Sequence, residues 1–133
     1  MAITKYASDS IMNAALEWVK TNAVKMYVCT ASISSASAVS YSKITSSAAL
    51  TSAISAAAIA SVALTSGSTS GKKLAIPEFA SVAVTGSGSA ARVCLVNSSG
   101  SVVVYTTTCT SQAVVSGNTI TIPTWDIEIR DPS

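Results

Sequence analysis

The chain has 133 residues, a length that one domain with a single core can use in full, so we expect residues 1–133 to form one domain. Charged residues make up 11% of the chain, against about 25% in an ordinary soluble domain, and the net charge at pH 7 is +2. This small positive charge excludes a basic surface of the kind that binds nucleic acid. It also leaves few charges to keep free copies apart, which favours a protein that works within an assembly.

No segment has the pattern of a secretion signal or a membrane span. The N-terminus passes from Tyr6 into the polar residues Ser8 and Asp9 without an apolar stretch. Residues 44–71 carry no charge, but between 44 and 64 seven positions are Ser or Thr and only six are Ile, Leu or Val. Because Ala and Ser contribute little to insertion, we expect no membrane partner.

Residues 8–22 are predicted to form a helix, which follows an N-terminal arm at 1–7. Ser8 or Asp9 can cap the helix. Its apolar residues at helical spacing are Ile11, Ala15, Trp18 and Val19. We expect this face to lie on a sheet with Trp18 as its anchor; the alternative is an amphipathic helix that docks on a partner.

A β-rich body is predicted from 24 to 130, and it begins with a strand over 24–31 whose side chains alternate between two faces. A Ser/Ala-rich segment at 32–64 follows. Within it we expect an exposed loop at 32–43. Residues 44–64 should form one or two short helical turns and then a strand, because 59–64 alternates between apolar and small residues.

The rest of the chain reads as short strands separated by turns. Strands are expected at 72–76, around Val82 and Val84, at 91–96, at 102–108 and at 119–129, with turns at 65–71, 86–88, 97–100 and 116–118. Many short strands after one helix predict a mainly β fold. We expect an antiparallel β-sandwich or a barrel-like fold with one N-terminal α-helix.

The last predicted strand contains a change of phase. Ile120 and Ile122 lie on one face of a regular strand, whereas Trp125 and Ile127 lie on the other. All four can face one core only if the chain shifts by one residue near Pro123, which lacks the amide hydrogen that a ladder needs. The sequence therefore predicts a bend at 123–124 where the strand crosses from one sheet towards another.

None of the candidate chemical motifs meets the requirements of its site. The segment 67–73 (GSTSGKK) is one residue short of a phosphate-binding loop and lacks the Ser or Thr after the lysine, so we expect a turn. Cys29, Cys94 and Cys109 fit no metal-ligand spacing and the chain has no His. We expect them to be small apolar residues of strands, and a single Cys29–Cys94 or Cys94–Cys109 disulfide stays open.

The acidic residues near the C-terminus predict ion pairs more than catalysis. Asp126, Glu128 and Arg130 share one face of an extended strand, with Asp131 just beyond. Two carboxylates at this spacing could act as acid and base or bind calcium, but the face reads as solvated or as an ion-pair face between subunits. The serines near a lysine, Ser8, Ser42 and Ser70, lack the setting of a nucleophile. We therefore expect no catalytic, cofactor-binding or metal-binding residue, and no enzyme.

The C-terminal half carries a resemblance to a family. Residues 88–96 (GSAARVCLV), 103–112 (VVYTTTCTSQ) and 116–129 (SGNTITIPTWDIEI) resemble small structural proteins of tailed-bacteriophage virions. In those proteins a G-x-A-x-H/R-V-x-L-V strand precedes a T-T-C-T-x-Q strand end and a G-N-T-V-x-I-P-x-W-x-I-x-I strand. Residues 70–74 (SGKKL) are similar to their S-G-R-K segment. The chain departs from the pattern at Cys94 and throughout 32–64.

The resemblance implies a structural role in the virion, assembled in the host cytoplasm. The favoured form is a capsid decoration or cement protein, whose partners are the major capsid protein and copies of itself. Homotrimers fit this form because decoration often occupies three-fold positions. The alternative is a tail, neck or fibre component that binds carbohydrate or a receptor, for which Tyr27, Tyr41 or Trp125 would supply an exposed aromatic platform. The candidate contact surfaces are the arm at 2–8, the uncharged segment 32–61 and unpaired sheet edges.

Overall fold

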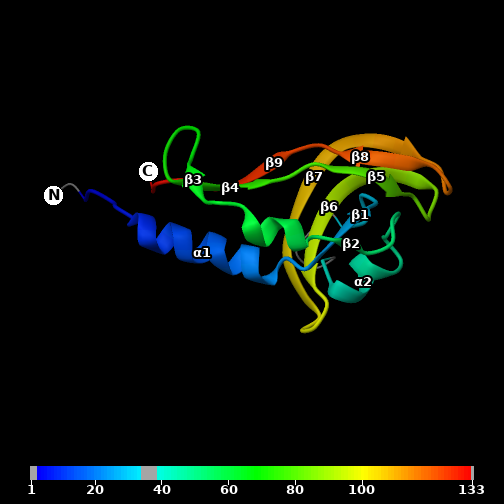
Figure 1. The fold of residues 1–133 in the computed structure, drawn as a ribbon, viewed down its shortest axis with the longest axis horizontal. Helices are drawn as coiled ribbons and strands as arrows, with labels where there is room; N and C mark the ends of the chain where they lie inside the picture. Colours follow the sequence, from blue (N-terminus) through cyan, green and yellow to red (C-terminus); the bar gives the residue numbers. More distant parts are fainter. Residues whose placement is uncertain (1–2, 34–38, 133) are drawn as a thin grey trace.

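A computed structural model describes residues 3–33 and 39–132 of the protein (Figure 1). Strands dominate it, every strand pair is antiparallel, and one long helix lies near the N-terminus, so the predicted fold class is confirmed. The elements are α1 (Asp9–Asn22), β1 (Lys25–Cys29), α2 (Tyr41–Thr45), β2 (Ile54–Ser55), the 3-10 helix η1 (Ala57–Ser61), β3 (Thr65–Ser66), β4 (Lys72–Ile76), β5 (Phe79–Ala83), β6 (Gly88–Asn97), β7 (Val102–Val114), β8 (Thr119–Ile122) and β9 (Trp125–Ile129).

The strands form a sandwich-like arrangement of two layers. One layer is a sheet with the strand order β2-β1-β6-β7, and the other contains the sheet β3-β4-β9 and the ribbon β5-β8. The main core lies between them and joins Met26 and Leu95 of the first layer to Leu74 and Ile127 of the second. These residues bury nearly all of their surface, which provides most of the hydrophobic stabilisation of the fold.

A second, smaller core covers the opposite face of the first layer. The alternation predicted for β1 is present, with Met26 and Val28 in the main core and Cys29 in the smaller one. Cys29 lies there with Cys94 and with Ile44 of the short helix α2. The strands β1 and β6 are therefore apolar on both faces because each face meets a core.

The last strand breaks where the sequence predicts. β8 ends at Ile122 and pairs with β5, and β9 begins at Trp125 and pairs with β4. The break crosses the whole ribbon, because residues 77–78 and 123–124 separate the pair Ile76–Trp125 from the pair Phe79–Ile122. Each interruption starts with a proline, which cannot donate a ladder hydrogen bond. The bend lets Ile122 and Ile127 reach the same core.

The helix α1 forms where it was predicted, and Val19 of the predicted face packs against the main core, but Trp18 is not its anchor. The Ser8 side chain caps it by accepting a hydrogen bond from the Ile11 amide at 3.4 Å. Met12 and Leu16 are buried, whereas Ile11 is 67% and Trp18 50% exposed. The buried pair, Met12 and Leu16, and the exposed pair, Ile11 and Trp18, both have helical spacing. Asp9 lies on the face of the buried pair and forms an ion pair with Lys72 of β4 at 3.2 Å. This long-range ion pair helps to fix the rotation of the helix, and no local pattern indicates it.

Two expectations for the Ser/Ala-rich segment are wrong. The strand expected at 59–64 is absent, because Ile59 lies in η1 and residues 62–64 belong to no strand. The loop expected at 32–43 is not wholly exposed, since Ile33 is buried and α2 begins at Tyr41; residues 34–38 lie outside the described part of the chain. Stretches this short show no reliable period, so tertiary contacts determine their structure.

The hairpin of β6 and β7 is longer than predicted. The strands extend well beyond 91–96 and 102–108, and the turn between them lies close to the predicted 97–100. β7 forms the edge of its sheet, and its pairing with β6 shifts twice, which leaves Val104 and residues 109–111 as bulges. Bulges twist an edge strand and make it a poorer template for another strand.

In the described part of the chain, no helix has the length and apolar character that a membrane span requires.

Exchanging side chains on the two faces of α1 tests which one is buried. We expect Leu16→Ala to lower the free energy of unfolding by about 2–5 kcal/mol, because it leaves a cavity in the main core. Trp18→Ala should cost less than about 1 kcal/mol in dilute solution, because half of this side chain is already in water. Urea unfolding monitored by circular dichroism measures both. Equal losses, or a larger loss for Trp18→Ala, would contradict this orientation of the helix.

Candidate functional site

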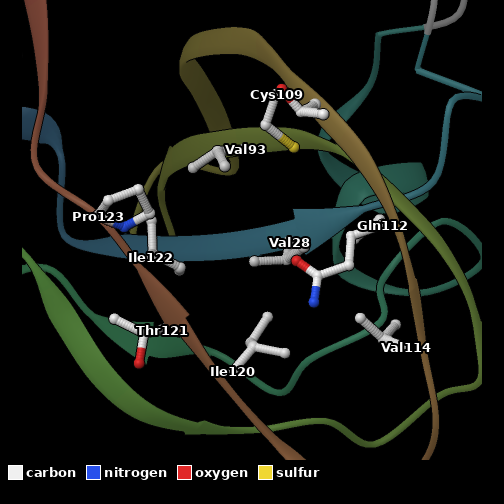
Figure 2. A pocket seen from close by; sticks show the side chains of 11 residues that line it. Val28, Val93, Cys109, Gln112, Val114, Ile120, Thr121, Ile122 and Pro123 are labelled. Atoms are coloured by element: carbon white, nitrogen blue, oxygen red, sulfur yellow. The ribbon is translucent and has the colours of Figure 1, made fainter.

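A cleft lies between the two layers, beside the break at Pro123. It has a volume of about 250 Å³ and is lined by Val28, Ala90, Val93, Cys109, Thr110, Gln112, Val114, Ile120, Thr121, Ile122 and Pro123. Figure 2 shows Cys109 and Val93 at one end of the cleft, and Gln112 extending from β7 towards Val28. The bulge in β7 and the bend after β8 both lie along this cleft. The irregularities in strand pairing therefore coincide with the cleft.

A second hollow of about 200 Å³ adjoins the first and shares Val93, Cys109, Ile122 and Pro123 with it. Its other lining residues are Thr107, Thr108, Trp125 and Asp126. The ring of Trp125 is stacked on that of Tyr105, with 6.0 Å between the centroids and 25° between the planes. Tyr105 is 36% exposed. The second hollow therefore has an aromatic pair beside it, and its lining contains two threonine hydroxyls and one carboxylate.

The polar groups of this second hollow are only partly engaged. The Asp126 carboxylate lies 3.7 Å from the Lys73 ammonium on β4. The indole Nε1 of Trp125 is buried and donates to no acceptor among the described residues. Glu128, the other carboxylate that the sequence indicated, does not line the hollow. The second hollow thus combines an indole ring, two threonine side chains and one carboxylate, and Glu128 is not among its lining residues.

The glycine- and lysine-containing segment is a turn, as predicted. Residues 67–71 connect β3 to β4, and the Gly67 amide donates to the Gly71 carbonyl at 2.9 Å. Gly71 has a φ of +74°, a conformation that favours glycine. The strand β4 follows instead of the helix that a phosphate-binding loop requires, and both of its lysines, Lys72 and Lys73, form ion pairs within the chain.

The remaining acidic and serine residues have structural partners. The Glu128 carboxylate accepts a hydrogen bond from the Ser68 amide at 2.8 Å and lies 3.9 Å from Arg130, so it holds the turn between β3 and β4. The ion pairs of the predicted face therefore lie within one chain. Ser8 caps α1, and the lysine beside Ser42, Lys43, donates to the Ser32 carbonyl at 2.9 Å. Among the described residues, no group of acidic and cysteine side chains has the arrangement of a metal site.

The three cysteines are free thiols in two different environments. Cys29 and Cys94 are buried in the smaller core, where the hydrogen bond between their thiols and the loss of solvent raise the pKa of Cys29. Neither of the disulfides left open by the sequence is formed. Cys109 is exposed at the cleft, and partial burial raises its pKa although Arg92 opposes this shift.

Sequence reasoning missed most of the cleft. It singled out Trp125 and Asp126, but neither Tyr105 nor Gln112, and it placed Cys109 only as a strand residue. Tyr105 and Trp125 are twenty positions apart, on strands of different sheets, and their rings meet only in the folded chain. The alternation in each strand indicates which residues share a face, but it does not show which faces meet.

A second candidate surface lies on the N-terminal arm and the outer side of α1. Ile3 is 79% and Tyr6 84% exposed, and Ile11 and Trp18 continue the apolar surface along the helix. Four of the seven large apolar side chains exposed in the described chain are here, which is why we treat it as an interaction surface and not as scattered exposure.

The exposure of the cysteines predicts one reactive thiol in the native protein. A thiol-specific reagent should modify Cys109 alone, and all three cysteines after unfolding. Since only the thiolate reacts, the rate should rise about tenfold per pH unit while the pH stays below the raised pKa of Cys109. Cys109→Ser should abolish the native reaction, and equal reaction of two or three thiols would contradict the burial of Cys29 and Cys94.

Comparisons with known proteins found no relative of this chain. No family model matches it, and neither does any curated protein or solved structure. Its function therefore has to be argued from its own residues.

Proposed function

We propose that the protein is a non-enzymatic structural component of a bacteriophage virion, and that it decorates the capsid by binding the major capsid protein. The observation that carries this proposal is the exposure of two large apolar side chains, Ile3 and Tyr6, on the N-terminal arm. The partner follows from the resemblance of the C-terminal strands to small virion proteins.

The arm has the properties of a segment that binds a neighbour. Residues 3–8 form neither helix nor strand, and Figure 1 shows this end of the chain extending away from the two layers. Ile3 and Tyr6 are the two most exposed of the large apolar side chains. Covering such residues on a partner removes apolar surface from water, at the cost of ordering a short segment.

The proposed mechanism is passive. An arm that binds one capsid subunit while the body rests on the next adds interface, which must be broken before the subunits separate. Each copy contributes modestly, but a shell holds many symmetric copies and bivalent contact raises the effective affinity. Few charges on the chain limit electrostatic repulsion between neighbouring copies.

The partners of the polar side chains support a role without catalysis. Asp126 is engaged with Lys73, and Glu128 with the Ser68 amide, so each carboxylate has a local structural partner. The cleft is lined by apolar and hydroxyl side chains, Gln112, Cys109 and Asp126. Cys109 has a pKa shifted upwards, opposite to the shift that activates a cysteine nucleophile.

Adding the protein back to particles tests the proposal. Virions assembled without the protein should bind the wild-type chain and should then release their genome at a higher temperature, as measured by dye fluorescence during heating. Ile3→Ser/Tyr6→Ser should bind at least about tenfold more weakly, because it removes the apolar contacts of the arm. Val115→Ser, at another exposed apolar residue, is the matched control and should bind normally. No binding of the wild-type chain, or unchanged heat stability of decorated particles, would contradict the proposal.

One observation favours the alternative of a tail, neck or fibre component that binds carbohydrate. Of the aromatic residues considered for such a platform, Trp125 lines a hollow and is stacked on Tyr105 beside two threonine hydroxyls and a carboxylate. Aromatic faces and hydroxyl groups are a common surface for sugars. Tyr27 and Tyr41 instead pack against the smaller core.

Fluorescence can decide whether this cleft binds sugars. In Trp18→Phe, Trp125 is the only tryptophan, and a sugar in the hollow should change its emission, with a dissociation constant in the millimolar range that is common for single sugar rings. Tyr105→Ala should weaken this binding, whereas Tyr6→Ala, far from the hollow, should not. Saturable binding would favour the receptor-binding alternative over decoration. An unchanged spectrum across a panel of hexoses, aminosugars and bacterial surface oligosaccharides would exclude it.

A further inference from the structure

We infer that the outer face of α1 binds the same face of a second copy of the chain, as an antiparallel pair of helices about a two-fold axis. This contact concerns how copies of the protein meet, and it does not depend on the shell that they decorate. It can therefore fail while the proposed function holds, and the reverse is also true.

The apolar residues of α1 form one wide arc, but the body of the protein covers only part of it. Met12 and Leu16 face the body, and the exposed residues Ile11, Ala14, Ala15 and Trp18 lie on the adjoining outer part of the arc. At 100° per residue, these four positions fall within an arc of about 100°, the width of the stripe by which a helix packs on a neighbour. An apolar arc wider than the stripe needed to pack on one core leaves apolar surface uncovered, so a second partner is expected on its outer part.

The charges on α1 do not oppose a second copy. Its three charged side chains each have an ion-pair partner within the chain: Asp9 bonds Lys72, and Glu17 bonds Lys20, both at 3.2 Å. The stripe itself contains no charge. Two such helices can therefore approach each other without bringing unpaired like charges together.

The order of side-chain sizes along the stripe points to self-association. It reads large, small, small, large from Ile11 to Trp18, and this order is the same from either end. In an antiparallel pair, Ile11 of each copy lies beside Trp18 of the other, and Ala14 and Ala15 lie at the axis. Alanines there allow the helix axes to approach to about 8 Å, and opposed helix dipoles are favourable.

The stripe can supply the apolar centre of an interface, and the surface around it must supply the rest. Half of the Trp18 side chain alone is on the order of 100 Å². A standard interface takes roughly 800 Å² from each partner and surrounds an apolar centre with a polar rim. The exposed residues Ser10 and Thr21 flank the stripe and can form part of that rim. The bulged edge of β7, which is the other extended surface without charge, is less suited to pairing.

Sedimentation or light scattering of the full chain tests the inference. The wild-type protein should have twice the chain's mass of 13.4 kDa at micromolar concentrations and should dissociate on dilution. Ile11→Ser/Trp18→Ser should raise the dissociation constant at least about 100-fold, because both copies lose their central contacts. The matched control Val115→Ser, also at an exposed apolar residue, should leave the mass unchanged.

Trp18 fluorescence supplies a second measurement that leaves the helix α1 itself unchanged. In Trp125→Phe, emission from Trp18 should shift to the red and acrylamide should quench it more strongly over the dilution range in which the mass halves. The inference is overturned by a monomer at all concentrations, by a mass of three chains, or by a dimer that survives Ile11→Ser/Trp18→Ser. If only Ile3→Ser/Tyr6→Ser abolishes the dimer, the contact belongs to the arm and not to α1. If Trp18 emission does not change on dilution, the contact does not involve Trp18.

Discussion

The fold depends on one bend that two prolines impose on a ribbon of four strand segments. Pro77 and Pro123 begin the interruptions on opposite strands, so the ladder between β4–β5 and β8–β9 is broken at one level across its width. A proline has no amide hydrogen for the ladder, and the chain can shift its phase there without losing a bond that it could have made. The shift directs the apolar residues of both halves to one core. The cleft and the second hollow both lie beside Pro123. The same bend therefore accounts for the packing of the core and for the position of the candidate binding surface.

A core of small residues explains why the protein has so much apolar surface left over. Aliphatic residues, many of them Ala and Val, form most of both cores, and seven large apolar side chains of the described chain lie outside them, most on the arm, on α1 and on β7. With charged residues at 11% of the chain, little electrostatic repulsion opposes contact through these surfaces. The arm and the outer face of α1 are adjacent in the chain but differ in form. The first is an extended segment suited to a shell, and the second is a helical stripe suited to its own copy.

Much of the fold follows from local patterns, and most of the candidate site does not. The helix at 9–22, the strand at 25–29, the turn before Lys72 and the break at Pro123 each have a signal within a few residues: a cap, an alternation, a pair of glycines or a proline. The cleft is lined by residues of four strands, and the aromatic pair at the second hollow joins Tyr105 to Trp125 across two layers. No signal in either strand alone indicates that their faces meet.

The sequence by itself determined the class of the fold and the position of its main irregularity, because strand alternation and the missing amide hydrogen of Pro123 act locally. Only the tertiary structure decided which side of α1 is buried. Ile11 and Trp18 form as good an apolar stripe as Met12 and Leu16, and the choice between them rests on contacts such as the Asp9–Lys72 ion pair, between residues far apart in the chain. The same holds for the cysteines: their residue type is alike, and their packing makes Cys29 and Cys94 core residues and Cys109 an exposed thiol.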